Sequence, residues 1–288
     1  MPTRRHFLGA LSATLLAARL SHAAAAAELT PQLLRVALVC DTHTNLDTVG
    51  EPALYRPHFD TVIDQVNAAK VDAVLLGGDL TEGGTPATIA AFQAQAAKLE
   101  APQLRVAGNH DVGAKITQGT KSNLTDERVT QFEALMGPSL WEREIGGARF
   151  IGVNASLFGS GLQHEIAQWE FLEAALEKPN AAPCGTHLLT HYPPFLTSSD
   201  EPSDYWNLEP APRARLLALL KQAKVRGVFS GHIHRPLFNQ TDDLTLVTAP
   251  PVSFGLPRGQ QPEGWTLISL APGGEISFEV RSIDTKNT

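Results

Sequence analysis

The stretch LRVAGNHD occupies residues 104–111, and in it a short apolar run ends at a glycine that is followed by an amide, an imidazole and a carboxylate. Short apolar runs bounded in this way are typical of strands. Asn109, His110 and Asp111 therefore follow directly on the carboxyl end of a predicted strand. Side chains at that position are available for chemistry, because ligands bind beyond the carboxyl ends of parallel strands.

Four other apolar runs end in polar side chains in the same way. These predicted strands cover residues 33–40, 72–76, 186–190 and 227–230. The side chains that follow them, in chain order, are Asp41 and His43, then Asp79, then His191, then His232 and His234. Because the carboxyl ends of parallel strands meet at one edge of a sheet, we expect all of these side chains to converge. Glycines at positions 77, 78, 108 and 231 permit the sharp turns that this convergence needs.

Helical patterns alternate with the strands over most of the chain and predict an α/β fold. The expected helices cover residues 59–69, 85–99, 125–135, 165–176 and 211–223, and a further strand covers residues 149–153. After residue 230 the alternation stops, and strands at 244–248, 265–270 and 276–283 follow one another without helices. This order predicts a core of parallel strands that finishes in an antiparallel edge. Residues 28–288 contain no linker-like segment or internal repeat, so we expect them to form a single domain.

Seven of the strand-end side chains are oxygen or nitrogen donors, and no thiolate is among them. They are Asp41, His43, Asp79, Asn109, His191, His232 and His234. Such donors suit Mn, Fe or Zn better than Cu(I) or an iron–sulfur cluster. Seven donors are too many for one ion that keeps an open position, and they fit two ions that share a carboxylate. Each motif alone is also explained by an ordinary turn or a hydrogen-bonded histidine, so the metal hypothesis depends on the five motifs occurring together.

This series of motifs resembles the calcineurin-like metallophosphoesterase family. The motifs extend from Asp41 to His234, and each of them is complete. The resemblance implies a four-layer αββα sandwich, in which two mixed β-sheets are flanked by helices. It also implies a dinuclear metal centre at the carboxyl ends of the strands.

The resemblance further implies a role for each site residue. It assigns one ion to Asp41, His43 and His234, the other ion to Asn109, His191 and His232, and the bridge between them to Asp79. His110 then faces the substrate as a catalytic residue, and Asp111 orients its imidazole. The implied reaction is hydrolysis of a small phosphate ester, in which a hydroxide that bridges the ions attacks phosphorus in line with the leaving oxygen.

The residue at position 82 helps to distinguish between subgroups of this family. Purple acid phosphatases carry a tyrosine ligand three residues after the bridging aspartate, where this sequence has Glu82, so an Fe(III)–tyrosinate centre is disfavoured. The sequence from Gly78 to Thr81 and the pair Gln168 and Trp169 are similar to the subgroup that includes bacterial cyclic-nucleotide phosphodiesterases. We therefore expect a phosphodiester substrate ahead of a phosphomonoester.

Two other functions stay open, a metallo-nuclease and a non-catalytic scaffold with the same fold. The whole chain has a net charge of −7, and residues 1–27 carry three arginines and no acidic residue. The remaining chain therefore has 20 basic and 30 acidic residues, a net charge of −10. A nuclease needs a basic track, so we expect no nucleic-acid partner. A scaffold predicts lost ligands, and every expected ligand is present.

The first 27 residues resemble a signal peptide of the twin-arginine (Tat) type. Arg4 and Arg5 precede Phe7 and Leu8, and an apolar stretch rich in alanine and leucine follows. A loose N-terminal helix is the alternative. The apolar stretch is shorter than the roughly 20 residues of a membrane span, and we expect no span elsewhere. The resemblance implies export by the Tat machinery to the periplasm or the medium.

The composition of the whole chain is that of an ordinary globular protein, with 43% hydrophobic and 18% charged residues. We expect Cys40 to be buried and free, with a bridge to Cys184 as the alternative. In the irregular segment 193–212, Tyr205 and Trp206 either stack on the organic part of a substrate or pack the segment onto the protein body, and packing is favoured. Arg258 either contacts phosphate or is a solvated surface residue, and the surface interpretation is favoured.

Overall fold

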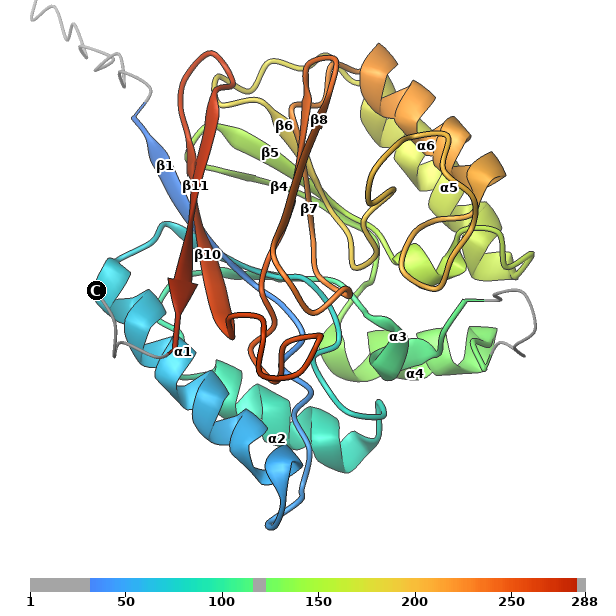
Figure 1. Ribbon diagram of the computed structural model, residues 1–288. Coiled ribbons are helices and arrows are strands. Elements are labelled where there is room, and N and C mark those ends of the chain that lie inside the picture. The colour runs from blue at the N-terminus through green and yellow to red at the C-terminus, as the bar shows by residue number, and fades with distance from the viewer. Residues whose placement is uncertain (1–31, 116–122, 284–288) are drawn as a thin grey trace, which may run out of the picture. The chain divides into compact units, whose positions relative to one another are not determined.

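The computed structural model describes residues 32–115 and 123–283, and there two mixed sheets pack face to face with helices on their outer faces (Figure 1). One sheet has the strand order β11-β10-β1-β2-β3, and the other has the order β4-β5-β6-β7-β9-β8. The predicted arrangement of two mixed sheets flanked by helices is confirmed. The expected signal peptide lies outside the described residues.

The first sheet joins the N-terminal strands to the last two strands of the chain. Its strands are β1 (Leu34–Val39), β2 (Ala73–Leu76), β3 (Gln103–Arg105), β10 (Gly264–Leu270) and β11 (Ile276–Ser282). The first three run parallel, while β10 pairs antiparallel with β1 in a register that sets Val36 opposite Ile268. The expected antiparallel edge is therefore correct for residues 264–282.

The second sheet contains two strands that the sequence did not reveal. Its strands are β4 (Trp141–Ile145), β5 (Ala148–Gly152), β6 (Thr186–Leu189), β7 (Gly227–Ser230), β8 (Leu237–Thr241) and β9 (Leu244–Thr248). The missed strands β4 and β8 form the two edges and are largely polar, because each is covered on one side at most. The strand β9 does not continue the antiparallel edge of the first sheet, because it lies in this other sheet, parallel to β7 and antiparallel to the edge strand β8.

Alternating side chains of β1 build two of the three apolar layers. Ala37 and Val39 pack with the helices on the outer face, whereas Val36 and Leu38 pack between the two sheets. The first sheet is covered by α1 (Tyr55–Ala69), α2 (Pro86–Ala96) and α4 (Asp126–Met136), and the second by α5 (Gln163–Glu177) and α6 (Pro210–Gln222). A strand with apolar residues on both faces fits this position between a helix layer and a second sheet.

The helix boundaries follow local capping signals. Thr85 and Thr125 cap α2 and α4, because their side chains accept hydrogen bonds from the backbone N–H groups of Thr88 and Arg128. The helix α1 begins at Tyr55, before the expected start at residue 59, and is preceded by a short 3-10 helix, η1 (Glu51–Leu54). A second 3-10 helix, η2 (Ala155–Leu157), and the short α3 (Asn109–Val112) follow strand ends.

Candidate metal centre

Five strand ends from both sheets meet at one place. Residues that follow β1, β2 and β3 come from the first sheet, and residues that follow β6 and β7 come from the second. The sequence alone suggested that these strands share one sheet, which is wrong. The convergence itself is present, because the carboxyl ends of the parallel strands in both sheets face the same side of the sandwich.

The first group of donors comprises Asp41, His43, Asp79 and His234. The Nε2 atoms of His43 and His234 are 3.2 Å apart. His43 Nε2 lies 3.6 Å from an oxygen of Asp79, and His234 Nε2 lies 3.6 Å from an oxygen of Asp41. Ligands about 2.1 Å from a tetrahedral ion are about 3.4 Å apart, so these four donors fit around one ion.

The second group of donors is built around His191. Its Nε2 lies 3.2 Å from Asp79 Oδ2 and 3.1 Å from Asn109 Oδ1. A ring nitrogen of His232 lies within 4.8 Å of the donor atoms of Asp79 and His191. Asp79 belongs to both groups, and its Oδ2 faces His43 on one side and His191 on the other.

Backbone carbonyls orient three of the imidazoles. His191 Nδ1 donates to the carbonyl of Gly77 at 2.8 Å, and His234 Nδ1 donates to that of Phe254 at 2.7 Å. His232 uses Nε2 instead, which donates to the Tyr205 carbonyl at 3.1 Å. A nitrogen that donates to a carbonyl carries the proton, so the other ring nitrogen presents its lone pair to the centre. The donor set therefore fits metal ions chemically as well as geometrically.

The backbone at the centre is unusual. Eight described non-glycine residues have a left-handed φ, and five of them are expected ligands. They are Asp41, His43, Asp79, His232 and His234, with φ between 45° and 73°. This conformation is unfavourable for residues with a Cβ, and it persists where surrounding contacts impose it, commonly at functional sites.

Two of the expected glycine turns have a direct steric reason. Gly78 has a φ of 89°, and a Cβ there would lie 2.6 Å from Nδ1 of His191. A Cβ on Gly108 would lie 2.1 Å from the backbone nitrogen of Asp79. Both glycines allow neighbouring strand ends to approach closely enough for their side chains to share the centre.

Asp111 does not hold His110 in the way we expected. Its two carboxylate oxygens accept hydrogen bonds from the backbone N–H groups of Leu80, Thr81 and Gly108 and from the Thr81 hydroxyl, at 2.9 to 3.1 Å. The carboxylate is therefore occupied in holding the turns that carry Asp79 and Asn109.

The imidazole of His110 is held by Glu82, a contact that the sequence did not indicate. Glu82 Oε1 lies 3.2 Å from His110 Nδ1, and Oε2 lies 2.5 Å from His43 Nδ1. Burial alone would raise the pKa of Glu82, but hydrogen bonds from both imidazoles lower it to about 2. Burial lowers the pKa of His110, but the hydrogen bond to Glu82 and the charge of Asp79 raise it to about 9. Glu82 therefore supports a protonated His110 beside the two donor groups.

We expect Glu82→Gln to lower kcat about tenfold while leaving both metal ions bound. The glutamine amide keeps the shape of the side chain but lacks the negative charge that favours the His110 imidazolium. The expected loss is modest because the Glu82 side chain is 43% exposed, so solvent screens its charge. The measurement is kcat together with metal content. The effect is expected to shrink in a His110→Ala background, because contacting residues couple. An equal decrease in kcat in the native and His110→Ala backgrounds would mean that Glu82 acts only through its contact with His43. The exposed Glu144→Gln is the control variant.

The segment after β6 covers the second donor group. The Asn109 amide donates to the Tyr205 hydroxyl at 3.4 Å, and the Tyr205 carbonyl accepts from His232. The buried Lys115 ammonium anchors the segment, because it donates to the Asp204 carbonyl at 2.8 Å and to Glu209 at 2.7 Å. The structural role of Lys115 could not be predicted from the sequence, because its hydrogen-bond partners are about 90 residues away along the chain.

The other expectations concern residues outside the donor groups. Cys40 and Cys184 are both buried and free, as favoured. The Arg258 side chain is half exposed and pairs with Glu51, in agreement with a surface role. Among residues 32–115 and 123–283, no helix is both long and apolar enough to cross a bilayer.

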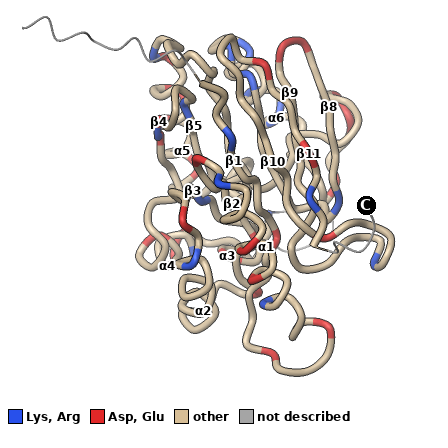
Figure 2. Tube along the Cα trace, turned by 90° about the vertical axis from the view of Figure 1, so that its left-hand side faces the viewer, with Lys and Arg blue, Asp and Glu red and all other residues tan. Residues whose placement is uncertain are grey.

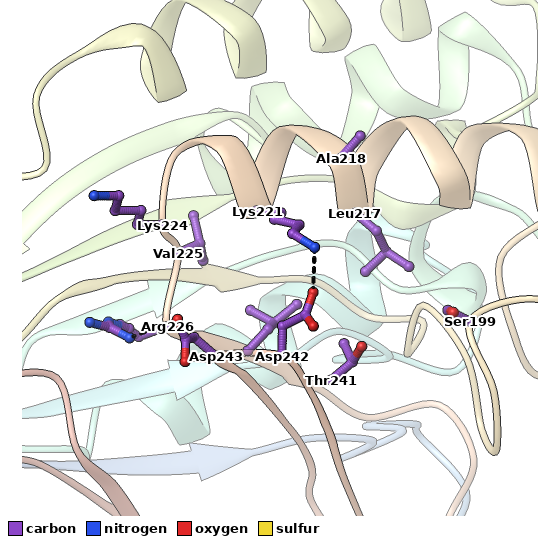
Figure 3. A pocket seen from close by; sticks show the side chains of 11 residues that line it. Ser199, Leu217, Ala218, Lys221, Lys224, Val225, Arg226, Thr241, Asp242 and Asp243 are labelled. Atoms are coloured by element: carbon purple, nitrogen blue, oxygen red, sulfur yellow. Dashed lines mark hydrogen bonds and ion pairs between the residues drawn. The ribbon is translucent and has the colours of Figure 1, made fainter.

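A cavity of about 550 Å³ lies away from this centre, between α6 and the β8–β9 hairpin (Figure 3). Val225 and Arg226, which precede β7, and Leu244 at the start of β9 line it, so it belongs to the opposite end of the second sheet. Lys221 Nζ and Asp242 Oδ2 form an ion pair at 2.7 Å within its lining. This cavity therefore contributes nothing to the donor groups.

Comparisons with known proteins point to one family. The family model of the calcineurin-like phosphoesterases matches residues 34–236. A probable cyclic nucleotide phosphodiesterase of Synechococcus sp. is 24% identical over 257 residues, which cover 88% of this chain and 93% of that protein. The serine/threonine-protein phosphatase CPPED1 of Danio rerio is 32% identical over 184 residues, which cover 61% of this chain and 55% of that protein. The match thus spans about half the length of CPPED1.

Solved structures share the fold at low sequence identity. A purple acid phosphatase from yellow lupin seeds superimposes with a TM-score of 0.64 at 17% identity, covering 89% of this chain and 52% of that one. A dimetal phosphatase from Danio rerio superimposes with a TM-score of 0.60 at 12% identity, covering 86% and 99%. Because the family model covers most of the chain, from β1 to the residues after His234, the chain belongs to the calcineurin-like phosphoesterase family.

Proposed function

We propose that this protein is a dinuclear-metal phosphoesterase that hydrolyses a small phosphodiester. The observation that carries the proposal is the position of Asp79, whose Oδ2 lies 3.6 Å from His43 Nε2 and 3.2 Å from His191 Nε2. One carboxylate shared by two groups of nitrogen and oxygen donors is the arrangement that two neighbouring cations require. Mn, Fe and Zn all suit the donors.

The side chains have separate tasks in this reaction. Two cations at these positions would polarise the phosphate oxygens and activate a water molecule for in-line attack. The His110 ring lies 4.5 Å from that of His43, measured between centroids, and is positioned to give a proton to the leaving oxygen. Glu82 orients the His110 imidazole, and Asp111 holds the backbone turns beneath it.

The preference for a diester rests on the extent of the similarities. The relative that is matched over 93% of its length is named a probable cyclic nucleotide phosphodiesterase, whereas the protein phosphatase CPPED1 is matched over 55%. A phosphomonoesterase is therefore the second candidate. A nuclease is disfavoured, because Lys and Arg are interspersed with Asp and Glu along the described chain (Figure 2). A scaffold is disfavoured, because all seven expected donors lie in the two groups.

The test uses metal-reconstituted protein and two chromogenic substrates. Hydrolysis of bis-p-nitrophenyl phosphate with a higher kcat/KM than p-nitrophenyl phosphate is expected. The opposite order would favour a monoesterase, and hydrolysis of neither substrate at any metal composition would contradict a phosphoesterase. Cyclic nucleotides and glycerophosphodiesters complete the panel of candidate substrates.

Metal removal is expected to reduce both activity and stability. A ligand present at 100 times its Kd stabilises the folded state by about 2.7 kcal/mol, so chelation should lower the melting temperature by several degrees. The measurement is the melting temperature with and without EDTA, followed by re-addition of each metal. Full ester hydrolysis in excess chelator by protein shown to be metal-free would contradict the proposal.

We also propose that residues 1–27 act as a Tat-type signal peptide and that the protein is exported. The pair Arg4 and Arg5 before an apolar stretch supports this proposal. The expected result is loss of the protein from the periplasmic fraction when both arginines are replaced by lysine. Unchanged export of that variant would contradict the Tat assignment.

A further inference from the structure

A small cavity lies beside the candidate metal centre and is separate from its donors. It measures about 290 Å³ and is lined by Trp206, Ile233, Arg235, Leu256 and Pro257. Ile233 stands between His232 and His234 in the chain. The cavity wall is thus built from the segment that supplies two expected ligands.

Two contacts connect the cavity lining to these histidines. The indole of Trp206 lies 5.5 Å from the ring of His232, measured between centroids. The backbone N–H of Leu256 donates to the His234 carbonyl at 2.8 Å. A group bound in the cavity would therefore sit next to a phosphate held at the centre.

Trp206 differs from the other tryptophans of the protein. Trp141, Trp169 and Trp265 are at most 7% exposed, as expected of residues that pack the core. Trp206 is only partly buried: it packs edge-on against Tyr205 of its own segment, at 4.8 Å between ring centroids, and it also lines the cavity. An aromatic side chain kept partly exposed in a recess is typical of a ligand-binding surface.

The chemistry of the lining selects a flat, apolar group. Ile233, Leu256 and Pro257 offer apolar surface, and Trp206 offers an aromatic face. The exposed Arg235 adds a guanidinium, which stacks favourably on aromatic rings. Pockets for drug-sized ligands measure about 300–1,000 Å³, so this cavity has room for a small ring system rather than a peptide segment.

We propose that this cavity binds the organic part of the substrate and that this part is a flat aromatic group. The inference rests on the proposed phosphoesterase function, because it places the phosphate of the same molecule at the metal centre. It makes Trp206 a specificity-determining residue. It also favours a small aryl or heterocyclic phosphate ester over a phosphorylated protein side chain.

The test measures binding without turnover, by calorimetry on metal-loaded protein with three phosphonates. Phenylphosphonate, cyclohexylphosphonate and methylphosphonate carry the same anionic group on a flat ring, a puckered ring and a methyl group. The native protein is expected to bind phenylphosphonate about tenfold more tightly than methylphosphonate. Cyclohexylphosphonate is expected to bind more weakly than phenylphosphonate, and equal affinity of the two rings would overturn the aromatic preference.

Variants of Trp206 separate the cavity from the metal centre. Trp206→Ala is expected to remove the tenfold advantage of phenylphosphonate and to leave methylphosphonate affinity unchanged, while Trp206→Phe retains most of the advantage. Equal losses for both phosphonates, or no loss for either, would overturn the proposal. The exposed Phe238→Ala is the control.

The outcome is distinguishable from failure of the proposed function. If the native protein binds phenylphosphonate selectively through Trp206 but hydrolyses no ester, the cavity is supported and the phosphoesterase proposal fails. If it hydrolyses esters but shows no preference among the phosphonates, the phosphoesterase proposal stands and the cavity does not bind the organic group.

Discussion

Replacing Asp79 by asparagine is expected to empty both halves of the metal centre and to lower kcat at least about 10³-fold. The carboxylate is the one side chain common to both donor groups, and its Oδ2 faces His43 and His191. Asparagine offers one neutral oxygen, so two cations would lose their shared negative charge. Loss of several kcal/mol of stabilisation by the cations corresponds to a decrease of this size.

Elemental analysis alongside kinetics checks this expectation. The Asp79→Asn protein should contain well under one ion per chain at a metal concentration that saturates the native protein. The exposed Asp64→Asn, which changes the same charge on the outer face of α1, should keep both ions and full activity. Two bound ions in Asp79→Asn protein would remove Asp79 from the bridging position.

The strands and donors that could be predicted are those whose pattern lies within a few consecutive residues of the sequence. A buried strand needs apolar side chains on both faces, so β1, β2 and β7 are visible as mainly apolar runs. A metal-ligand side chain that follows such a strand within a few residues can be recognised from the same pattern, as for Asp41 and Asp79. The family resemblance then supplied the pairing into two sheets.

The parts that could not be predicted depend on contacts between distant segments. The edge strands β4 and β8 are half polar, so their patterns resemble those of loops. Lys115 and Glu209 meet only after folding. Glu82, not Asp111, holds the His110 imidazole because of the direction in which each carboxylate points. The spacing of residues along the chain does not predict that direction.

Removing the His110 imidazole, as in His110→Ala, is expected to lower kcat about 10²- to 10⁴-fold, the usual contribution of a positioned general acid. Both donor groups should stay intact, because the His110 ring contacts Glu82 and the edge of His43 rather than replacing a donor in either group. Its backbone N–H, which donates to Asp79 Oδ1 at 2.8 Å, is retained in alanine.

The dependence on the leaving group distinguishes a proton donor from a residue that only shapes the site. p-Nitrophenolate leaves without protonation, whereas an alkoxide needs a proton as the ester bond breaks. The loss in His110→Ala should therefore be larger for an alkyl ester than for a p-nitrophenyl ester, at unchanged metal content. Equal losses for both leaving groups would assign His110 to binding of the phosphate, and loss of the metal ions in this variant would place it among the ligands. A larger loss with alkyl esters would instead identify His110 as the proton donor, whose ring is held by its hydrogen bond to the Glu82 carboxylate.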